Sequence, residues 1–141
     1  MFSTVSAPRL PGPDRRVSAA AGKRVALALF TGVTVDHDLT AYDRYAAEYH
    51  CQHTPTMPNG TAAAKEFFAP IITNYPDFSV SVKRIVAEGD YVTIHSHFKM
   101  TVEDPGIAIV DLLRVRGGKV VEHWDVVQPV PATSANGNTM F

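Results

Sequence analysis

Residues 107–127 read IAIVDLLRVRGGKVVEHWDVV, which is the most informative segment of the sequence. An apolar run, two adjacent glycines and a second apolar run are typical of two antiparallel β-strands joined by a tight turn. Asp111 interrupts the first run. A lone carboxylate among apolar side chains has to be paired, protonated or solvated from a cavity, because burying an unpaired charge is costly. The stretch therefore predicts a terminal hairpin with an aspartate in an unusual environment.

The length of the hairpin loop determines which side chains share a face of this ribbon. A three-residue loop at 116–118 pairs Val115 with Lys119, and it places Asp111 opposite His123 with Asp125 on the same face. A two-residue turn at the glycines instead places Asp111 opposite Trp124 and turns Asp125 to the other face. We favour the three-residue loop, because it gathers the polar residues into one group.

Two carboxylates and an imidazole in apolar surroundings suit general acid–base catalysis. Burial and a neighbouring like charge raise the pKa of one carboxyl group, and histidine already titrates near neutrality. Two other readings remain open. Asp111 and His123 could form a buried hydrogen bond with no further role, or Glu122, His123 and Asp125 could form a solvated edge.

Upstream of this ribbon the period of the apolar residues changes at Pro76. From Phe78 to Met100 apolar and polar residues alternate, with a turn at 88–90, which predicts two further strands. Before Pro76 the apolar residues are spaced by three and four, which predicts helices over three segments: 24–33, 40–48 and 61–74. Helices followed by an antiparallel meander indicate an α+β fold. We expect a cone-shaped curved antiparallel sheet with the three N-terminal helices packed on its concave face, and a ligand pocket at the mouth of the cone.

The chain of 141 residues has the length of one domain, which we place at residues 24–131. Residues 1–23 contain several prolines and arginines without apolar periodicity, so we expect a flexible N-terminal arm. Residues 132–141 form a polar C-terminal tail.

The composition argues against several classes of protein. Thirteen basic and fourteen acidic side chains leave a formal net charge of −1, which does not suit nucleic-acid or membrane-surface binding. The longest apolar run is too short to span a bilayer. A single cysteine, Cys51, excludes an internal disulfide framework, and together with the lack of a secretory signal it favours a cytoplasmic location.

Further candidate residues lie outside the terminal hairpin. His53 follows the second expected helix, where it can lean over the mouth of the cone, and the hydroxyl of Tyr49 could donate to a substrate carbonyl. His95 and His97 alternate with apolar residues, so we expect them on the back of the sheet, where a subunit contact is one possible role. No tight ligand spacing is present, so we expect neither a metal nor another cofactor. We expect the pocket to be lined by Tyr49, Phe67, Phe98 and Trp124.

Three segments carry a resemblance to a known family: residues 49–55 (YHCQHTP), 87–90 (AEGD) and 118–126 (GKVVEHWDV). Together and in this order they resemble the SnoaL-like polyketide cyclases, part of the nuclear-transport-factor-like and ketosteroid-isomerase-like superfamily. The resemblance covers about residues 24–131. It implies a cone-shaped α+β barrel that forms a homodimer through its sheet.

The resemblance also implies an activity and residue roles. The cyclases close a ring by intramolecular aldol condensation without a cofactor, and Asp125 matches their acid/base aspartate on the last strand. Where the cyclases have a histidine on the preceding strand this chain has Asp111, which instead matches the hydrogen-bond-donating aspartate of ketosteroid isomerases.

The expected function is a cofactor-independent enzyme acting on a small carbonyl compound through an enolate, by cyclisation, isomerisation or dehydration. Asp125 would remove the proton, Asp111 or His53 would donate to the developing enolate, and His123 would orient or shuttle the proton. The alternative is a non-catalytic ligand-binding or dimeric interaction module with the same fold.

Overall fold

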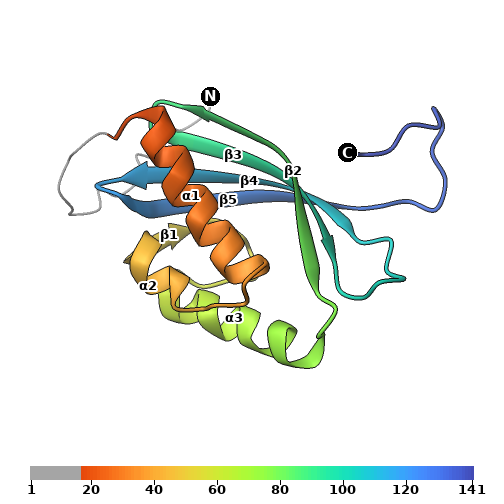
Figure 1. The fold of residues 1–141 in the computed structure, drawn as a ribbon, viewed down its shortest axis with the longest axis horizontal. Helices are drawn as coiled ribbons and strands as arrows, with labels where there is room; N and C mark the ends of the chain where they lie inside the picture. Colours follow the sequence, from red (N-terminus) through yellow and green to blue (C-terminus); the bar gives the residue numbers. More distant parts are fainter. Residues whose placement is uncertain (1–16) are drawn as a thin grey trace, which may run out of the picture.

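The computed structural model describes residues 17–141, so most of the expected N-terminal arm, residues 1–16, lies outside the described residues. Three helices are present in the described part: α1 (Ala19–Thr34), α2 (Ala41–Tyr45) and α3 (Thr61–Asn74). Helix α1 begins at Ala19 because the Ser18 hydroxyl accepts the N–H of Ala21 at 3.1 Å and caps the first turn. Figure 1 shows α1 running across one face of the sheet, with α2 and α3 near β1.

The five strands form one mixed sheet. They are β1 (Ala46–Gln52), β2 (Ser79–Glu88), β3 (Tyr91–Lys99), β4 (Ile107–Arg116) and β5 (Lys119–Pro129), in the spatial order β1-β5-β4-β3-β2. Strands β2 to β5 form the expected antiparallel meander. Strand β1 pairs with β5 in parallel, so the expectation of a purely antiparallel sheet is wrong.

Strand β1 replaces the last three residues of the helix that the sequence predicts over residues 40–48. The helical spacing of Tyr42, Tyr45 and Tyr49 suggests one continuous helix. In the structure α2 ends at Tyr45 and the chain becomes extended at Ala46. The competing interaction is pairing with β5, a strand more than seventy residues away in the chain, and local spacing cannot reveal such a partner. The helix expected over residues 61–74 is observed with those bounds as α3.

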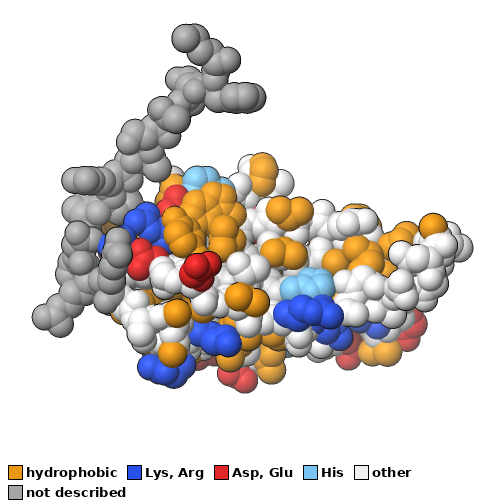
Figure 2. All heavy atoms as spheres, turned by 90° about the horizontal axis from the view of Figure 1, so that it is seen from above, with side chains coloured by type: hydrophobic (Ala, Val, Ile, Leu, Met, Phe, Trp, Pro, Cys, Tyr) orange, Lys and Arg blue, Asp and Glu red, His pale blue; other side chains and the backbone are white. Residues whose placement is uncertain are grey.

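The two faces of the sheet differ in what covers them. We call the face that packs on α1 the inner face and the opposite one the outer face. The hydrophobic core lies between α1 and the inner face, where Leu29 and Val33 are buried with Ile94, Leu113 and Val115. The side of the molecule turned away from α3, shown in Figure 2, carries hydrophobic side chains interspersed with acidic, basic and histidine side chains.

The terminal hairpin has a different turn from the one we favoured. Arg116 pairs with Lys119, so the turn consists of Gly117 and Gly118, both with positive φ, as a tight primed turn requires. Farther along, the register shifts by one residue, because Val121 is an extra residue between the partners of Val115 and Arg114. This β-bulge re-aims every side chain of β5 beyond it.

The C-terminal tail folds back over the outer face of β3. The Phe141 ring stacks on His97 with ring centroids 4.1 Å apart, and on His95 at 5.6 Å. The two histidines therefore lie on the back of the sheet as the alternation predicts. No helix of the described residues is long and apolar enough to cross a membrane.

Candidate functional site

A chain of hydrogen bonds links three polar side chains on the inner face. Asp111 on β4 lies directly opposite Asp125 on β5, and His123 is the next residue of β5 on that face. His123 Nε2 lies 2.8 Å from Asp111 Oδ1, and His123 Nδ1 lies 2.7 Å from Gln52 Oε1 on β1. The bulge brings the three hairpin residues to one face, although the two-residue turn alone would separate them.

Gln52 determines which nitrogen of His123 carries a proton. The N–H of Thr54 donates to Gln52 Oε1 at 3.1 Å, which identifies that atom as the oxygen of the amide. An oxygen only accepts, so His123 Nδ1 must be the donor in the 2.7 Å contact. A further proton therefore lies between His123 Nε2 and Asp111 Oδ1, either on the acid or on the imidazole.

Asp111 is the most buried member of this group, with 8% of its surface exposed. Burial raises the pKa of its carboxyl group, and the neighbouring charge of Asp125 adds to that rise, whereas the hydrogen bond from His123 opposes it. Its second oxygen, Oδ2, is buried and has no hydrogen-bond partner among the described residues. Buried oxygens without a partner are rare, which marks the environment of Asp111 as unusual.

Asp125 lies at the accessible end of the group. Along the inner face of β5, Val120 is buried, His123 and Asp125 are half-buried, and Val127 is 47% exposed. In the described part of the chain no side chain forms a hydrogen bond or ion pair with the Asp125 carboxylate. The Asp125 carboxylate is therefore accessible to solvent and has no side-chain partner among the described residues.

Two residues of this site, His50 and Gln52, escaped the sequence analysis, and Tyr42 lies beside them. Burial raises the pKa of the Tyr42 hydroxyl, and the charge of Asp111 adds to the rise, so Tyr42 stands near the acid. Burial lowers the pKa of His50, whose ring stacks on Tyr42 with centroids 6.4 Å apart. A strand assignment for residues 46–52 would have revealed His50 and Gln52, because alternate residues of a strand share a face.

Two expected site residues lie on the outer face of the sheet. His53 lies on the outer face, where its ring stacks on Trp124 with centroids 4.6 Å apart and its Nε2 is 2.9 Å from Glu122 Oε1. It does not lean over the Asp111–His123 pair. Trp124 alternates with His123 and Asp125 and therefore also lies on the outer face, not in an inner pocket.

The other expected lining residues lie apart from the hydrogen-bonded group. Tyr49 is 75% exposed, because it lies out of phase with His50 on β1, so it does not line an inner pocket. Phe67 is 40% exposed on α3 and packs edge-on against Phe68. Phe98 packs against Phe30 and Phe78 on the inner face, near the C-terminal end of β3.

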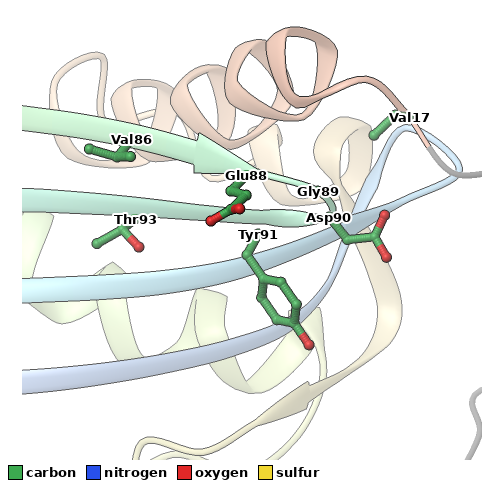
Figure 3. A pocket seen from close by; sticks show the side chains of 7 residues that line it. All are labelled: Val17, Val86, Glu88, Gly89, Asp90, Tyr91 and Thr93. Atoms are coloured by element: carbon green, nitrogen blue, oxygen red, sulfur yellow. The ribbon is translucent and has the colours of Figure 1, made fainter.

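The two best-formed hollows of the described residues do not contain the Asp111–His123 pair. The larger, about 530 Å³, lies by the β2–β3 turn and is shown in Figure 3; it is lined by Val17, Val86, Glu88, Gly89, Asp90, Tyr91 and Thr93. The second, about 320 Å³, involves α2, β1 and Lys119. Neither of these hollows is therefore the ligand pocket expected beside the inner group.

Among residues 17–141, two groups of side chains have the composition to hold a metal ion. The inner group is Asp111, His123 and Asp125, and the outer group is Cys51, His53 and Glu122; within each group the ligand atoms lie within 4.8 Å of one another. Burial raises the pKa of the Cys51 thiol, and the charge of Glu122 adds to that rise. A raised pKa leaves less thiolate, so Cys51 is not an activated nucleophile.

The model of the SnoaL-like polyketide cyclases matches residues 24–135. The chain belongs to the SnoaL-like polyketide cyclase family. No curated protein sequence is a significant match to this family member.

Solved structures support the same fold. TsrD from Streptomyces laurentii is similar with a TM-score of 0.65 at 15% identity, over 79% of this chain and 91% of that one. A protein from Kribbella flavida DSM 17836, provisionally named a ketosteroid isomerase, is similar with a TM-score of 0.66 at 19% identity, over 82% of this chain and 84% of that one. AclR from Streptomyces galilaeus, provisionally named a hydroxylase, is similar with a TM-score of 0.61 at 26% identity, over 79% of this chain and 81% of that one. This SnoaL-like chain therefore shares its α+β fold with proteins of several names.

Proposed function

We propose that this SnoaL-like protein is a cofactor-independent acid–base enzyme that removes a proton next to a carbonyl group of a small, polyketide-like substrate. The single observation that carries the proposal is the arrangement of Asp111, His123 and Asp125. An acid and an imidazole share a proton in a buried position, beside a second carboxylate that is free and accessible. Groups with such different environments suit opposite roles in proton transfer.

Asp125 is the proposed base. It is half-buried and accessible from the exposed end of β5, and no described side chain hydrogen-bonds to it. In the proposed step the substrate C–H bond breaks, its proton passes to the Asp125 carboxylate, and the electron pair moves onto the carbonyl oxygen. The base ends neutral and the substrate becomes an enolate.

Asp111 is the proposed donor to that enolate oxygen. Burial raises its pKa, which favours the protonated form, and its Oδ2 has no partner. When the single proton shared with His123 lies on the acid, Asp111 can donate it to the substrate oxygen, and His123 stays neutral with its proton on Nδ1. Tyr42, whose pKa is also raised, stays protonated and offers a second hydroxyl on the same side. Donors that meet charge as it develops contribute most to such reactions.

His123 and Gln52 are the proposed positioning residues. The contact from His123 Nδ1 to Gln52 keeps the imidazole ring in one orientation, so that Nε2 faces Asp111. The enolate formed in this site can attack a second carbonyl, take up a proton at another carbon, or expel a β-hydroxyl group. Family membership and the names of the similar proteins support cyclisation or isomerisation.

The test compares Asp125→Asn with the matched surface variant Asp77→Asn. The probes are 3-oxo esters and linear polyketone mimics in deuterated water, and NMR follows deuterium uptake next to the carbonyl. We expect Asp125→Asn to lower the exchange rate by about 100-fold or more, the usual contribution of a positioned base, and Asp77→Asn to leave it unchanged.

Two results would contradict the proposal. Equal exchange in Asp125→Asn and wild type would show that Asp125 is not the base. Chemical-shift changes that report binding of these probes, without exchange above the protein-free rate, would instead support the non-catalytic binding module.

A further inference from the structure

We infer that the outer face carries a binding site for a zinc-class divalent cation, built from Cys51, His53 and Glu122. The site lies on the opposite face of the sheet from the proposed catalytic group. Its donors are a sulfur, an imidazole nitrogen and a carboxylate oxygen, which is a ligand set that borderline metals such as Zn²⁺ accept and that Mg²⁺ and Ca²⁺ do not.

The parallel pairing of β1 and β5 assembles these donors. Cys51 is the partner of Glu122 in the register, and the N–H of His53 donates to the carbonyl of His123 at 2.9 Å. Because Gln52 pairs with His123 toward the inner face, the residues on either side of Gln52 turn outward together. The site is therefore a direct consequence of the strand that the helical spacing concealed.

The donor atoms converge on one point. Cys51 Sγ lies 3.6 Å from His53 Nε2, and the same nitrogen lies 2.9 Å from Glu122 Oε1. A tetrahedral Zn²⁺ with bonds of about 2.3 Å to sulfur and about 2.0 Å to nitrogen and oxygen separates sulfur from nitrogen by about 3.6 Å and nitrogen from oxygen by about 3.3 Å. The sulfur–nitrogen distance already fits, and the nitrogen–oxygen pair has to open by about 0.4 Å to meet that geometry.

This convergence distinguishes a metal site from a nucleophilic triad. In a triad the thiol and the carboxylate approach the two different nitrogens of the imidazole, so that the ring can pass a proton between them. Here Cys51 and Glu122 both approach Nε2 of His53. Three donor atoms within 4.8 Å of one another suit a cation that replaces the shared proton.

The surroundings hold the donors in place. The Trp124 ring stacks on the His53 ring with an angle of 4° between the planes, which fixes the direction of Nε2. Arg114 Nη1 lies 3.3 Å from the other carboxylate oxygen of Glu122, Oε2, so Oε1 is left facing Cys51 and His53. The His53 side chain is 38% exposed, so the ion can enter from solvent and a water molecule can complete the coordination.

An ion in this position also bears on the inner face. Cys51 and His53 flank Gln52, whose amide oxygen orients His123. Tying both neighbours of Gln52 to Glu122 on β5 holds this end of the edge strand β1 in register, so the ion stabilises the same segment that positions the proposed catalytic histidine.

The experiment uses the full chain after removal of metals, with Zn²⁺ and Co²⁺ as the probes. Cys51 is the only cysteine of the sequence, so a thiol reagent reports on this site alone. We expect one Zn²⁺ per chain, a rise in Tm on binding, at least about tenfold slower alkylation of Cys51, and a thiolate-to-cobalt charge-transfer band with Co²⁺.

The variants separate this site from the other clusters. We expect Cys51→Ser and His53→Gln to weaken binding by at least about tenfold, and His53→Gln to remove the protection of Cys51 as well. His97→Gln, on the same face but beside Phe141, and Asp111→Asn, in the inner group, should bind Zn²⁺ as wild type does. Loss of binding in Asp111→Asn with retention in Cys51→Ser would place the ion in the inner group and overturn the inference. Absence of any binding up to millimolar Zn²⁺ would overturn it too.

Discussion

Replacing Gln52 by leucine removes the contact that orients the proposed catalytic histidine. Gln52 Oε1 accepts from His123 Nδ1 at 2.7 Å and from the Thr54 N–H at 3.1 Å. Leucine has nearly the same size, so the change leaves two donors without an acceptor and creates no large cavity. The His123 side chain is only 16% exposed, so water replaces its lost partner poorly.

The expected loss of stability follows from these two donors. A buried donor left without a partner costs about 1–3 kcal/mol, and the half-buried Thr54 amide contributes at the lower end because water can approach it. We expect Gln52→Leu to lower the free energy of unfolding by about 2 kcal/mol in urea titrations. The matched control Gln128→Leu, at an exposed position of β5, should change it by less than about 0.5 kcal/mol.

The variant should also change the protonation of His123. With Gln52 in place Nδ1 carries a proton, which ¹⁵N chemical shifts of the imidazole report directly. In Gln52→Leu we expect a mixture of tautomers and a fall in kcat of at least about tenfold, with a smaller change in KM. A wild-type imidazole with an unprotonated Nδ1, or a variant with unchanged tautomer and kcat, would refute the role given to Gln52.

Two further predictions concern charge and assembly. The folded-state pKa of Asp111 is raised, so its contribution to stability is present at low pH and is lost as the pH rises through that pKa. Asp111→Asn should therefore flatten the decline in unfolding free energy above about pH 4. Urea denaturation at several pH values measures this decline, and an unchanged slope in the variant would contradict the prediction. We also propose that the exposed apolar side chains of the outer face join two copies of the chain, among them Val126, which is 74% exposed and lies opposite Val110. In analytical ultracentrifugation we expect the wild type to sediment as a dimer and Val126→Asp as a monomer. A monomeric wild type would exclude this interface.

The sequence predicted the parts of the fold that depend on local patterns. Alternation after Pro76 predicted the meander, and apolar spacing predicted α3 with its observed bounds. The short strand β1 could not be predicted, since its partner β5 is remote in the chain and the tyrosine spacing around it imitates a helix. That one error moved attention to Tyr49 and His53 and away from Gln52.

The grouping of Asp111, His123 and Asp125 was predicted for a reason that proved wrong. The expected three-residue loop is absent, and the bulge at Val121 restores the face that the two-residue turn would have lost. Adjacent valines at 120 and 121 give no signal of a bulge, because either residue can be buried. Side-chain chemistry identified the group correctly where the assumed turn geometry did not.

The extra residue at Val121 makes the spacing of this strand as important as its composition. If β5 paired without the bulge while keeping Val121, the β5 side chains of the two clusters would exchange faces, whereas deleting Val121 would leave a regular hairpin in which Glu122 still lies opposite Arg114 and Asp125 opposite Asp111. Relatives that lack this one residue would thus keep the chemistry of both faces, and an alignment that places their gap farther along β5 would compare side chains from opposite faces.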